Sequence, residues 1–237
     1  MIHARNLTKR YGDHTAVDGL SFAIPAGQIC AFLGHNGAGK STTVKMLTGL
    51  LAPTSGTVEI AGTADPIERK RRIGVVPENL ALYGALTPLE HLQLSGKIYG
   101  LSATDTGARS EGLLHALDLG AASNTPAEQC SHGTRKKTAL ALALLHNPRV
   151  LLLDEPYEGV DPITAEAIAT LLQRRAQSGG TVFFTSHMLS MVERLAHRVL
   201  LIRAGRLIWD GDPHEIAQRY FDEHPDAAHT PDLAWLR

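Results

Sequence analysis

Hydrophobic positions along the chain alternate between short apolar runs and longer stretches in which apolar residues recur every three or four positions. The short runs predict strands, and the longer stretches predict amphipathic helices. The predicted strands are residues 2–7, 16–24, 29–33, 58–60, 73–76, 150–153, 182–185, 199–202 and 207–209. Strands that alternate with helices are typical of an α/β domain built around a mostly parallel sheet.

Two of these runs, ICAFL at 29–33 and VLLL at 150–153, contain only apolar residues. Such runs are typical of strands that are buried on both faces of a parallel sheet. The strands near the N-terminus alternate instead, and Gly12, Pro25 and Gly27 interrupt them. This region therefore predicts a small antiparallel sheet.

Several helix ends can be predicted from capping residues. Thr87, Asp161 and Asp212 each precede a proline, which is the order found at the N-terminus of many helices. Glu90 adds the acidic residue that completes a capping box with Thr87. The helix that follows the first buried strand is predicted to end at Gly49, since glycine readily adopts the left-handed conformation found there.

The strand signal stops at about residue 79 and returns after about residue 135, and helical periodicity takes its place between them. We interpret residues 79–135 as a helical lobe inserted into the α/β core. The last residues, 221–237, mix proline, acidic residues and a final apolar patch, and we expect a loosely ordered extension. The predicted organisation is one domain over residues 1–220, followed by that extension.

Composition and charge exclude several classes of protein. The 237 residues are 43% hydrophobic and 20% charged, a balance that argues against disorder. Lysine and arginine number 23 and aspartate and glutamate 24, for a net charge of −1. A near-neutral chain has no overall field for binding nucleic acid, and we expect no nucleic-acid partner. The short basic runs at 69–72 and 135–137 are interpreted as solvated faces.

Cys30 and Cys130 lie far apart and form no CxxC motif, so we expect neither a disulfide framework nor a zinc site. Cys30 lies within a buried strand and is interpreted as a core residue. The longest apolar candidate, 139–145, is far shorter than the roughly 18 residues that a membrane span requires. The N-terminus has no apolar leader region. These features predict a soluble intracellular protein.

The segment GHNGAGKS at 34–41 fits the pattern GxxxxGK[ST] and follows a buried strand. In this pattern, glycines let backbone N–H groups surround phosphate oxygens, the lysine contacts the terminal phosphates, and the serine hydroxyl binds Mg²⁺. A glycine-rich turn that binds nothing is the alternative, and the strand context argues against it. The candidate nucleotide-binding residues are Gly34, His35, Asn36, Gly37, Ala38, Gly39, Lys40, Ser41 and Thr42.

Polar residues also follow other predicted strands. Asp154 and Glu155 follow the strand at 150–153, and we expect Asp154 to hold Mg²⁺ and Glu155 to polarise a water molecule. Glu78 and His187 follow two more strands, although each could instead be a surface acid or a helix cap. Because ligands bind beyond the carboxyl ends of parallel strands, these residues together predict a nucleotide hydrolase.

With these motifs in place, the chain resembles the ATP-binding subunit of ABC transporters over roughly residues 2–220. GHNGAGKS matches the Walker A motif of that family, and VLLLDE matches Walker B. CSHGT at 130–134 stands at the place of the LSGGQ signature, and EGVD at 158–161 stands at the D-loop. His187 falls at the switch histidine, and Tyr11 matches the aromatic residue that stacks on adenine. The implied fold is a P-loop NTPase core with an N-terminal antiparallel β subdomain and an inserted α-helical subdomain.

The resemblance implies that two copies, expected to form a homodimer, pair head to tail around ATP and Mg²⁺. The signature residues Ser131, His132, Gly133 and Thr134 would face the ATP bound by the partner. Asp161 would communicate across the dimer, and His187 would hold the γ-phosphate and the attacking water. Glu78 stands where the family usually has a glutamine that senses Mg²⁺.

The resemblance also implies a separate transmembrane permease, so that this chain would be peripheral on the cytoplasmic side of the membrane. The segment 79–94, which is expected to expose Leu80, Leu82, Tyr83 and Leu86, would dock the permease. Ordinary packing within the helical lobe is the alternative for these side chains.

The chain departs from the family pattern at several positions: Glu78, Cys130, His132, Thr134, Tyr157 and Glu158. A histidine in the signature is familiar in exporter-type ATPases of the drug-resistance and sodium-extrusion kind, which favours an exporter. The catalytic set is intact, and it predicts ATP hydrolysis. Two alternatives remain: a soluble ABC-type ATPase in translation, repair or cofactor assembly, and an ATP-gated regulatory module.

Overall fold

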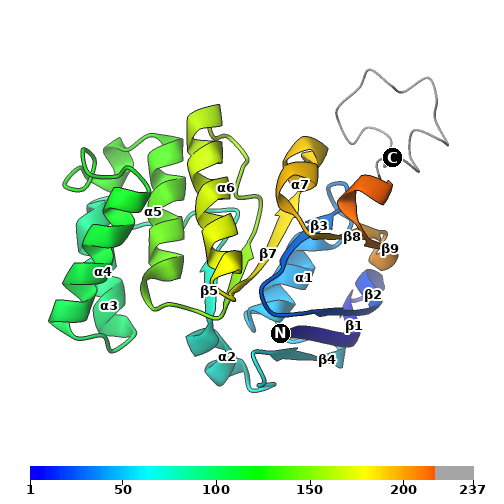
Figure 1. The fold of residues 1–237 in the computed structure, drawn as a ribbon. Helices are drawn as coiled ribbons and strands as arrows, with labels where there is room; N and C mark the ends of the chain where they lie inside the picture. The colour runs from blue at the N-terminus through cyan, green and yellow to red at the C-terminus, as the bar shows by residue number, and fades with distance from the viewer. Residues whose placement is uncertain (217–237) are drawn as a thin grey trace.

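The computed structural model describes residues 1–216, so the predicted extension at 221–237 lies outside the described residues. Two sheets organise the molecule (Figure 1). The smaller sheet has the order β2-β1-β4 and is antiparallel, with β1 at Ile2–Tyr11, β2 at His14–Ile24 and β4 at Ser55–Ile60. This is the antiparallel N-terminal sheet that the interrupted alternating strands predict.

The larger sheet has six strands in the order β5-β6-β7-β3-β8-β9. Its strands are β3 (Ile29–Leu33), β5 (Ile73–Val76), β6 (Val150–Leu153), β7 (Thr181–Ser186), β8 (Arg198–Arg203) and β9 (Arg206–Gly211). All neighbouring pairs are parallel except β8 and β9. The prediction of an α/β core with a mostly parallel sheet is confirmed.

The apolar runs are buried as their patterns predict. Every residue of β3 and β6 is buried, because both strands lie inside the sheet and are covered on both faces. The two sheets meet through aromatic rings: Phe22 stacks on Phe183 at 5.9 Å, and Phe32 lies 5.3 Å from Phe183. This shared core holds the first two strands against the larger sheet.

The helices of the described part are α1 (Lys40–Leu47), α2 (Pro66–Arg72), α3 (Pro88–Ile98), α4 (Ala103–Ala116), α5 (His132–Leu145), α6 (Pro162–Gln177) and α7 (Leu189–Leu195), with a short 3₁₀ turn, η1, at Ala127–Gln129. Between β5 and β6 the chain forms α3, α4, η1 and α5, which stand together on one side of Figure 1. The helix α5 extends beyond residue 135 and packs on β5.

The predicted caps are present. Thr87 and Glu90 form a capping box at the start of α3, with the Glu90 N–H donating to Thr87 Oγ1 at 3.2 Å and the Thr87 N–H donating to Glu90 Oε2 at 2.9 Å. Asp161 caps α6 by accepting the Thr164 N–H at 2.9 Å. After α1, Gly49 has a φ of 73°, the left-handed conformation that the sequence predicts at the end of this helix.

Two cysteines are free, with Cys30 buried in β3 as predicted. Within residues 1–216, no helix combines the length and the apolar character that crossing a bilayer requires. The interpretation of both basic runs as solvated faces is wrong at one residue in each. Arg69 is 5% exposed and Lys136 is 2% exposed, because α2 and α5 turn these side chains toward the protein interior.

Candidate functional site

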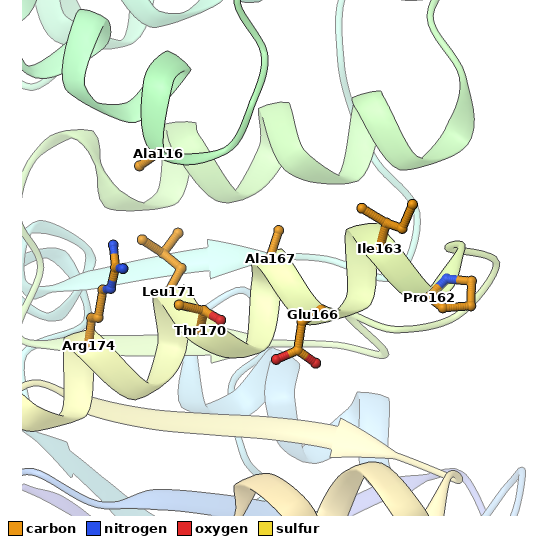
Figure 2. Close-up of a pocket in the computed structure, with 8 residues that line it drawn as sticks. All are labelled: Ala116, Pro162, Ile163, Glu166, Ala167, Thr170, Leu171 and Arg174. Atoms are coloured by element: carbon orange, nitrogen blue, oxygen red, sulfur yellow. The ribbon is translucent and has the colours of Figure 1, made fainter.

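The described surface has hollows of different character. One, of about 450 Å³, runs along α6 beside the end of α4 (Figure 2). Its lining is largely apolar and includes Ala116, Ile163 and Leu171. None of the predicted site residues lines this hollow. The site predicted from the sequence lies at the edge of the larger sheet instead.

Four adjacent parallel strands, β5, β6, β7 and β3, end at this edge. The residues that follow them carry the predicted chemistry: Glu78 after β5, Asp154 after β6, His187 after β7 and Gly34 after β3. Because neighbouring parallel strands end side by side, these four residues gather at one edge. The sequence-based expectation about this edge therefore agrees with the sheet topology.

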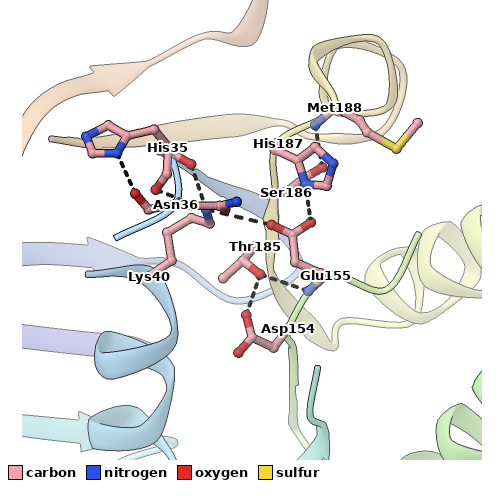
Figure 3. A network of polar contacts seen from close by, with 10 residues as sticks. His35, Asn36, Lys40, Asp154, Glu155, Thr185, Ser186, His187 and Met188 are labelled. Carbon is pink, nitrogen blue, oxygen red and sulfur yellow. Dashed lines mark hydrogen bonds and ion pairs between the residues drawn. The ribbon is translucent and has the colours of Figure 1, made fainter. Parts of the chain in front are cut away.

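The loop between β3 and α1 folds tightly, and glycine is required at two positions. A Cβ on Gly34 would lie 2.6 Å from the Ile202 carbonyl oxygen. Gly39 has a φ of 107°, and a Cβ there would lie 2.5 Å from the Ala16 oxygen. Inside the loop, the Lys40 ammonium donates to the Gly34 carbonyl at 2.6 Å, so the loop is closed around its own lysine (Figure 3).

A polar pocket of about 420 Å³ lies between this loop and the turn that joins β1 to β2. It brings together Tyr11, which is 50% exposed, and Glu78 from the opposite side. Gly34 and Ala38 belong to the same loop but are buried and do not line the pocket. The complete lining is Tyr11, His14, Ala16, His35, Asn36, Gly37, Gly39, Lys40, Ser41, Thr42 and Glu78.

Thr185 of β7 links the Asp154 carboxylate to the backbone of Glu155 (Figure 3). Its hydroxyl donates to Asp154 Oδ1 at 2.6 Å and accepts the backbone N–H of Glu155 at 2.8 Å. Asp154 and Glu155 are buried, with residue exposures of 5% and 8%. Thr185 could not be identified from the sequence, and the available signal was a polar pair, Thr185 and Ser186, directly after the apolar run of β7.

The Glu155 side chain lies between two basic groups. Its Oε1 is 3.8 Å from the Lys40 ammonium, and its Oε2 is 3.1 Å from His187 Nδ1. Burial raises the pKa of the Glu155 carboxyl, while His187 and Lys40 oppose that shift. A carboxylate with a raised pKa is a better proton acceptor than an ordinary surface carboxylate.

The signature-like residues lie outside the pocket of Tyr11 and Lys40. Ser131 caps α5 by accepting the Thr134 N–H at 3.1 Å, and Ser131 and His132 are exposed. Gly133 is buried against Thr164. A single chain therefore does not bring the residues at 131–134 onto its own phosphate loop.

Asp161 does not line that pocket either. It is exposed, and hydrogen bonds from Thr164 lower the pKa of its carboxyl. Two of the sequence departures have distinct surroundings. Tyr157 is 4% exposed and meets Phe184 edge to face, so it belongs to the core. Glu158 is exposed and shares a second polar pocket with Glu78, Asn79, His132, Lys136 and Gly159.

The expectation that segment 79–94 exposes four large apolar residues holds for only one of them. Tyr83 is 65% exposed. Leu80, Leu82 and Leu86 are only partly exposed, and Leu80 packs against the main hydrophobic core. The expectation is wrong for these leucines because the segment is held against η1: the Ala127 N–H donates to the Leu86 carbonyl at 2.9 Å, and the Glu128 N–H donates to the Gly84 carbonyl at 3.0 Å.

Comparison with known proteins identifies the family. The family model described as ABC transporter matches residues 17–158. The chain is 38% identical to the Nod factor export ATP-binding protein I of Ralstonia nicotianae over 219 residues, which cover 91% of this chain and 68% of that protein. It is 35% identical to the linearmycin resistance ATP-binding protein LnrL of Bacillus subtilis, with coverage of 92% and 71%.

Solved structures agree with this result. A structure described as the ATP binding subunit of an ABC transporter superimposes with a TM-score of 0.86 at 27% identity, covering 100% of this chain and 97% of that one. A dimeric ATP-binding cassette bound to ADP and Pi superimposes with a TM-score of 0.83 at 26% identity, covering 90% and 99%. The chain therefore belongs to the ABC transporter family, as an ATP-binding subunit that hydrolyses ATP to ADP and phosphate.

Proposed function

We propose that this chain drives an exporter: ATP closes a head-to-tail dimer of two copies, hydrolysis reopens it, and a separate transmembrane permease uses the motion. The observation that carries the proposal is the position of Glu155. This buried carboxylate has a raised pKa and lies between the Lys40 ammonium and His187. Such an arrangement suits a base that activates water beside a terminal phosphate.

In this proposal each residue of the edge has a defined role. The loop at 34–42 wraps the phosphates with backbone N–H groups, and Tyr11 stacks on the adenine ring. Lys40 neutralises the terminal phosphates. Glu155 accepts a proton from the attacking water while the water oxygen bonds to the γ-phosphorus. The bond between the γ-phosphorus and the bridging oxygen breaks, which releases ADP and phosphate. His187 orients that water and the γ-phosphate.

The residues of the edge also fit a Mg²⁺ ion. Ser41 and Asp154 offer hard oxygen ligands, and Glu78 lines the same pocket as Ser41. Residues 1–216 contain no cluster of three or more His, Cys, Asp or Glu side chains that could hold a metal ion alone. This suits Mg²⁺, which is usually bound by one or two protein ligands together with phosphate and water. The ion would neutralise charge that develops on the phosphates.

The second half of the site is proposed to come from another copy of the chain. Ser131, His132 and Asp161 are exposed and do not reach the chain's own phosphate loop. The N-terminal end of α5 carries a partial positive charge that suits a phosphate. Dimeric cassettes among the structural relatives support pairing of two copies.

The direction of transport follows from the relatives and from His132. The relatives include proteins named for Nod factor export and linearmycin resistance and a probable multidrug transporter ATP-binding protein of Escherichia coli. His132 stands in the signature, where exporter-type ATPases of the drug-resistance kind also have a histidine. Both observations support export. In this proposal the chain acts at the cytoplasmic side of the membrane.

The permease is proposed to dock in a groove between α2 and the end of α3 rather than on the leucines of segment 79–94. The groove has a volume of about 670 Å³ and is lined by Ile67, Lys70, Ile98 and Tyr99, among others. Ile67 and Ile98 are 67% and 73% exposed, a large exposure for isoleucine. Exposed apolar side chains beside a basic rim are typical of a protein contact.

The experiment is a comparison of tagged variants after gentle membrane solubilisation. The parent chain is expected to co-purify a polytopic membrane protein, and Ile98→Arg is expected to lose most of it. Ile208→Arg is the matched control, because Ile208 is 50% exposed on β9, away from the groove. It should retain the partner.

Recovery of the chain without any membrane protein would contradict the transport proposal. Salt-dependent binding of nucleic acid in its place would indicate a soluble ABC-type ATPase. Retention of the permease by Ile98→Arg would reject the groove while leaving transport intact.

A further inference from the structure

Lys136 is a buried lysine that no motif explains. It lies in the second turn of α5, is 2% exposed, and its ammonium donates a 2.6 Å hydrogen bond to the backbone carbonyl of Glu155. A buried ammonium is costly unless it is hydrogen-bonded and faces negative charge. Its place against the carbonyl of the candidate base therefore calls for a reason.

The backbone of Glu155 is held in an unusual conformation. Its φ is 48°, in the left-handed region that residues with a Cβ seldom adopt. Such a conformation persists only where the surroundings fix it. Thr185 accepts the Glu155 N–H on one side, and Lys136 binds the Glu155 carbonyl on the other. The two contacts fix the peptide groups on both sides of the Glu155 Cα.

Burial and nearby carboxylates act in opposite directions on Lys136. Burial lowers the pKa of Lys136 below its usual value, and Glu158, Glu155, Asp154 and Glu78 oppose that shift. Glu78 and Glu158 line the same pocket as Lys136. The carboxylates therefore offset part of the cost of burying the ammonium.

The start of α5 is tied to the segment after β6 at two further points. His132 lies over Gly159, where a Cβ would come within 3.2 Å of the imidazole ring. Gly133 packs against Thr164, where a Cβ would lie 3.2 Å from the hydroxyl oxygen. His132 and Lys136 are one helical turn apart. The signature turn and the segment carrying Glu155 therefore form one packed unit.

We propose that Lys136 is a positioning residue for ATP hydrolysis: by binding the Glu155 carbonyl it holds the base in its left-handed conformation and joins it to the turn that carries the signature residues. When the signature turn of one copy binds the ATP held by the partner, Lys136 thereby keeps Glu155 of that same copy in its catalytic position. The inference rests on the proposed role of Glu155 as the base.

The test compares Lys136→Met with Lys136→Arg in the purified full chain. Methionine fills the same volume without a donor, whereas arginine keeps a charged donor. We expect Lys136→Met to lower kcat about tenfold, with KM and the affinity for a fluorescent ATP analogue changed by less than about twofold. Lys136→Arg should keep kcat within about threefold of the parent. Lys137→Met removes the adjacent, half-buried charge and should leave kcat unchanged.

A second measurement separates this inference from the function on which it rests. Glu155→Gln is assayed beside the lysine variants. If Glu155→Gln retains turnover, the assignment of the base fails. If Glu155→Gln loses turnover while folded Lys136→Met keeps the parent kcat, the positioning role is overturned.

Thermal unfolding of each variant identifies a purely structural effect. If Lys136→Met does not fold, Lys136→Arg decides: a kcat near that of the parent supports the donor role. A folded arginine variant that binds ATP but has lost about tenfold in kcat contradicts it.

Discussion

The nucleotide edge of the larger sheet and the helices α3 and α4 are built in different ways. At the edge, Asp154, Glu155 and Thr185 are buried polar residues linked by hydrogen bonds. Glu155 also has a left-handed backbone. The helices α3 and α4 begin instead with local caps at Thr87 and Ser102, and each cap is satisfied within one turn.

This difference separates function from stability. Buried polar networks are effective for chemistry because the low polarity of the interior strengthens electrostatic interactions. Loss of one member leaves the others unpaired and lowers the stability of the fold. Local caps stabilise a helix without contacting the site. Substitutions at the edge should therefore change nucleotide binding or turnover, whereas substitutions of the capping residues of α3 and α4 should change stability alone.

The largest effect on ATP affinity is expected at Lys40. Lys40→Ala removes the ammonium that would contact the phosphates and leaves Glu155 without one of its basic neighbours. Loss of about 1.5–3 kcal/mol of charge-assisted contact corresponds to about 10- to 140-fold weaker ATP binding. Isothermal titration measures it. Lys45→Ala, at an exposed position of the same helix, should bind as the parent does, and equal affinities in all three proteins would remove Lys40 from the site.

Thr185→Val should lower both turnover and stability, because Thr185 contributes to the site and to the packing of the core. Valine keeps the shape but leaves the buried Glu155 N–H and Asp154 carboxylate without their shared partner. We expect a loss of about 1–3 kcal/mol in the free energy of unfolding, together with reduced turnover. Urea unfolding and phosphate release measure the two effects, and Thr185→Ser should retain both. An active, fully stable valine variant would contradict the network.

Thr87→Ala should affect stability alone. It removes the side chain that accepts the Glu90 N–H in the capping box. A lost cap of this kind lowers the free energy of unfolding by about 1 kcal/mol. ATP affinity should stay at the parent value. Thr87→Ser keeps the hydroxyl and should keep the stability of the parent. A clear change in ATP affinity in Thr87→Ala would contradict the separation, because it would show that α3 is coupled to the nucleotide edge.

The smallest effect is a pH dependence at the far end of α5. His146 stacks on Tyr99 with ring centroids 3.8 Å apart and lies 3.0 Å from the Ile73 carbonyl oxygen through Nε2. Burial, together with Arg109, lowers the pKa of His146 from 6.5, although the bond to Ile73 opposes this. A base whose pKa is lowered by folding stabilises the fold above the pKa of the unfolded chain and loses that contribution as pH falls.

We therefore expect the parent to lose more stability than His146→Gln between about pH 7.5 and about pH 5.5. Glutamine can still donate to Ile73 but does not titrate. Urea unfolding at both pH values gives the difference between the two proteins, which isolates this histidine from the others. Parallel losses in the two proteins would remove His146 as a source of the pH dependence.

The sequence predicted the strands and the helix caps well because these depend on short-range pattern. Each of the predicted strands is present, most of them extended at their ends, and the capping box at Thr87 is confirmed. The convergence of Gly34, Glu78, Asp154 and His187 could be predicted too. It follows from one rule, that ligands bind beyond the carboxyl ends of parallel strands.

Contacts between distant segments could not be predicted. Thr185 of β7 links the Asp154 carboxylate to the Glu155 backbone N–H, and Lys136 of α5 binds the Glu155 carbonyl. Neither contact has a spacing that identifies it. Lys136 was assigned to a solvated basic face because its neighbours in sequence are basic, whereas tertiary packing determined its burial. Likewise, Tyr157 departs from the family pattern, and its burial against Phe184 depends on tertiary packing that its neighbours in sequence do not indicate.

The most direct test of the account compares the parent with Glu155→Gln, with Glu111→Gln on the exposed face of α4 as the control. Phosphate release and molar mass by light scattering are measured with ATP and Mg²⁺. We expect that Glu155→Gln still binds ATP, forms a persistent dimer, and loses turnover by about 10²-fold or more, while the control matches the parent. Equal turnover in Glu155→Gln and the parent would contradict it.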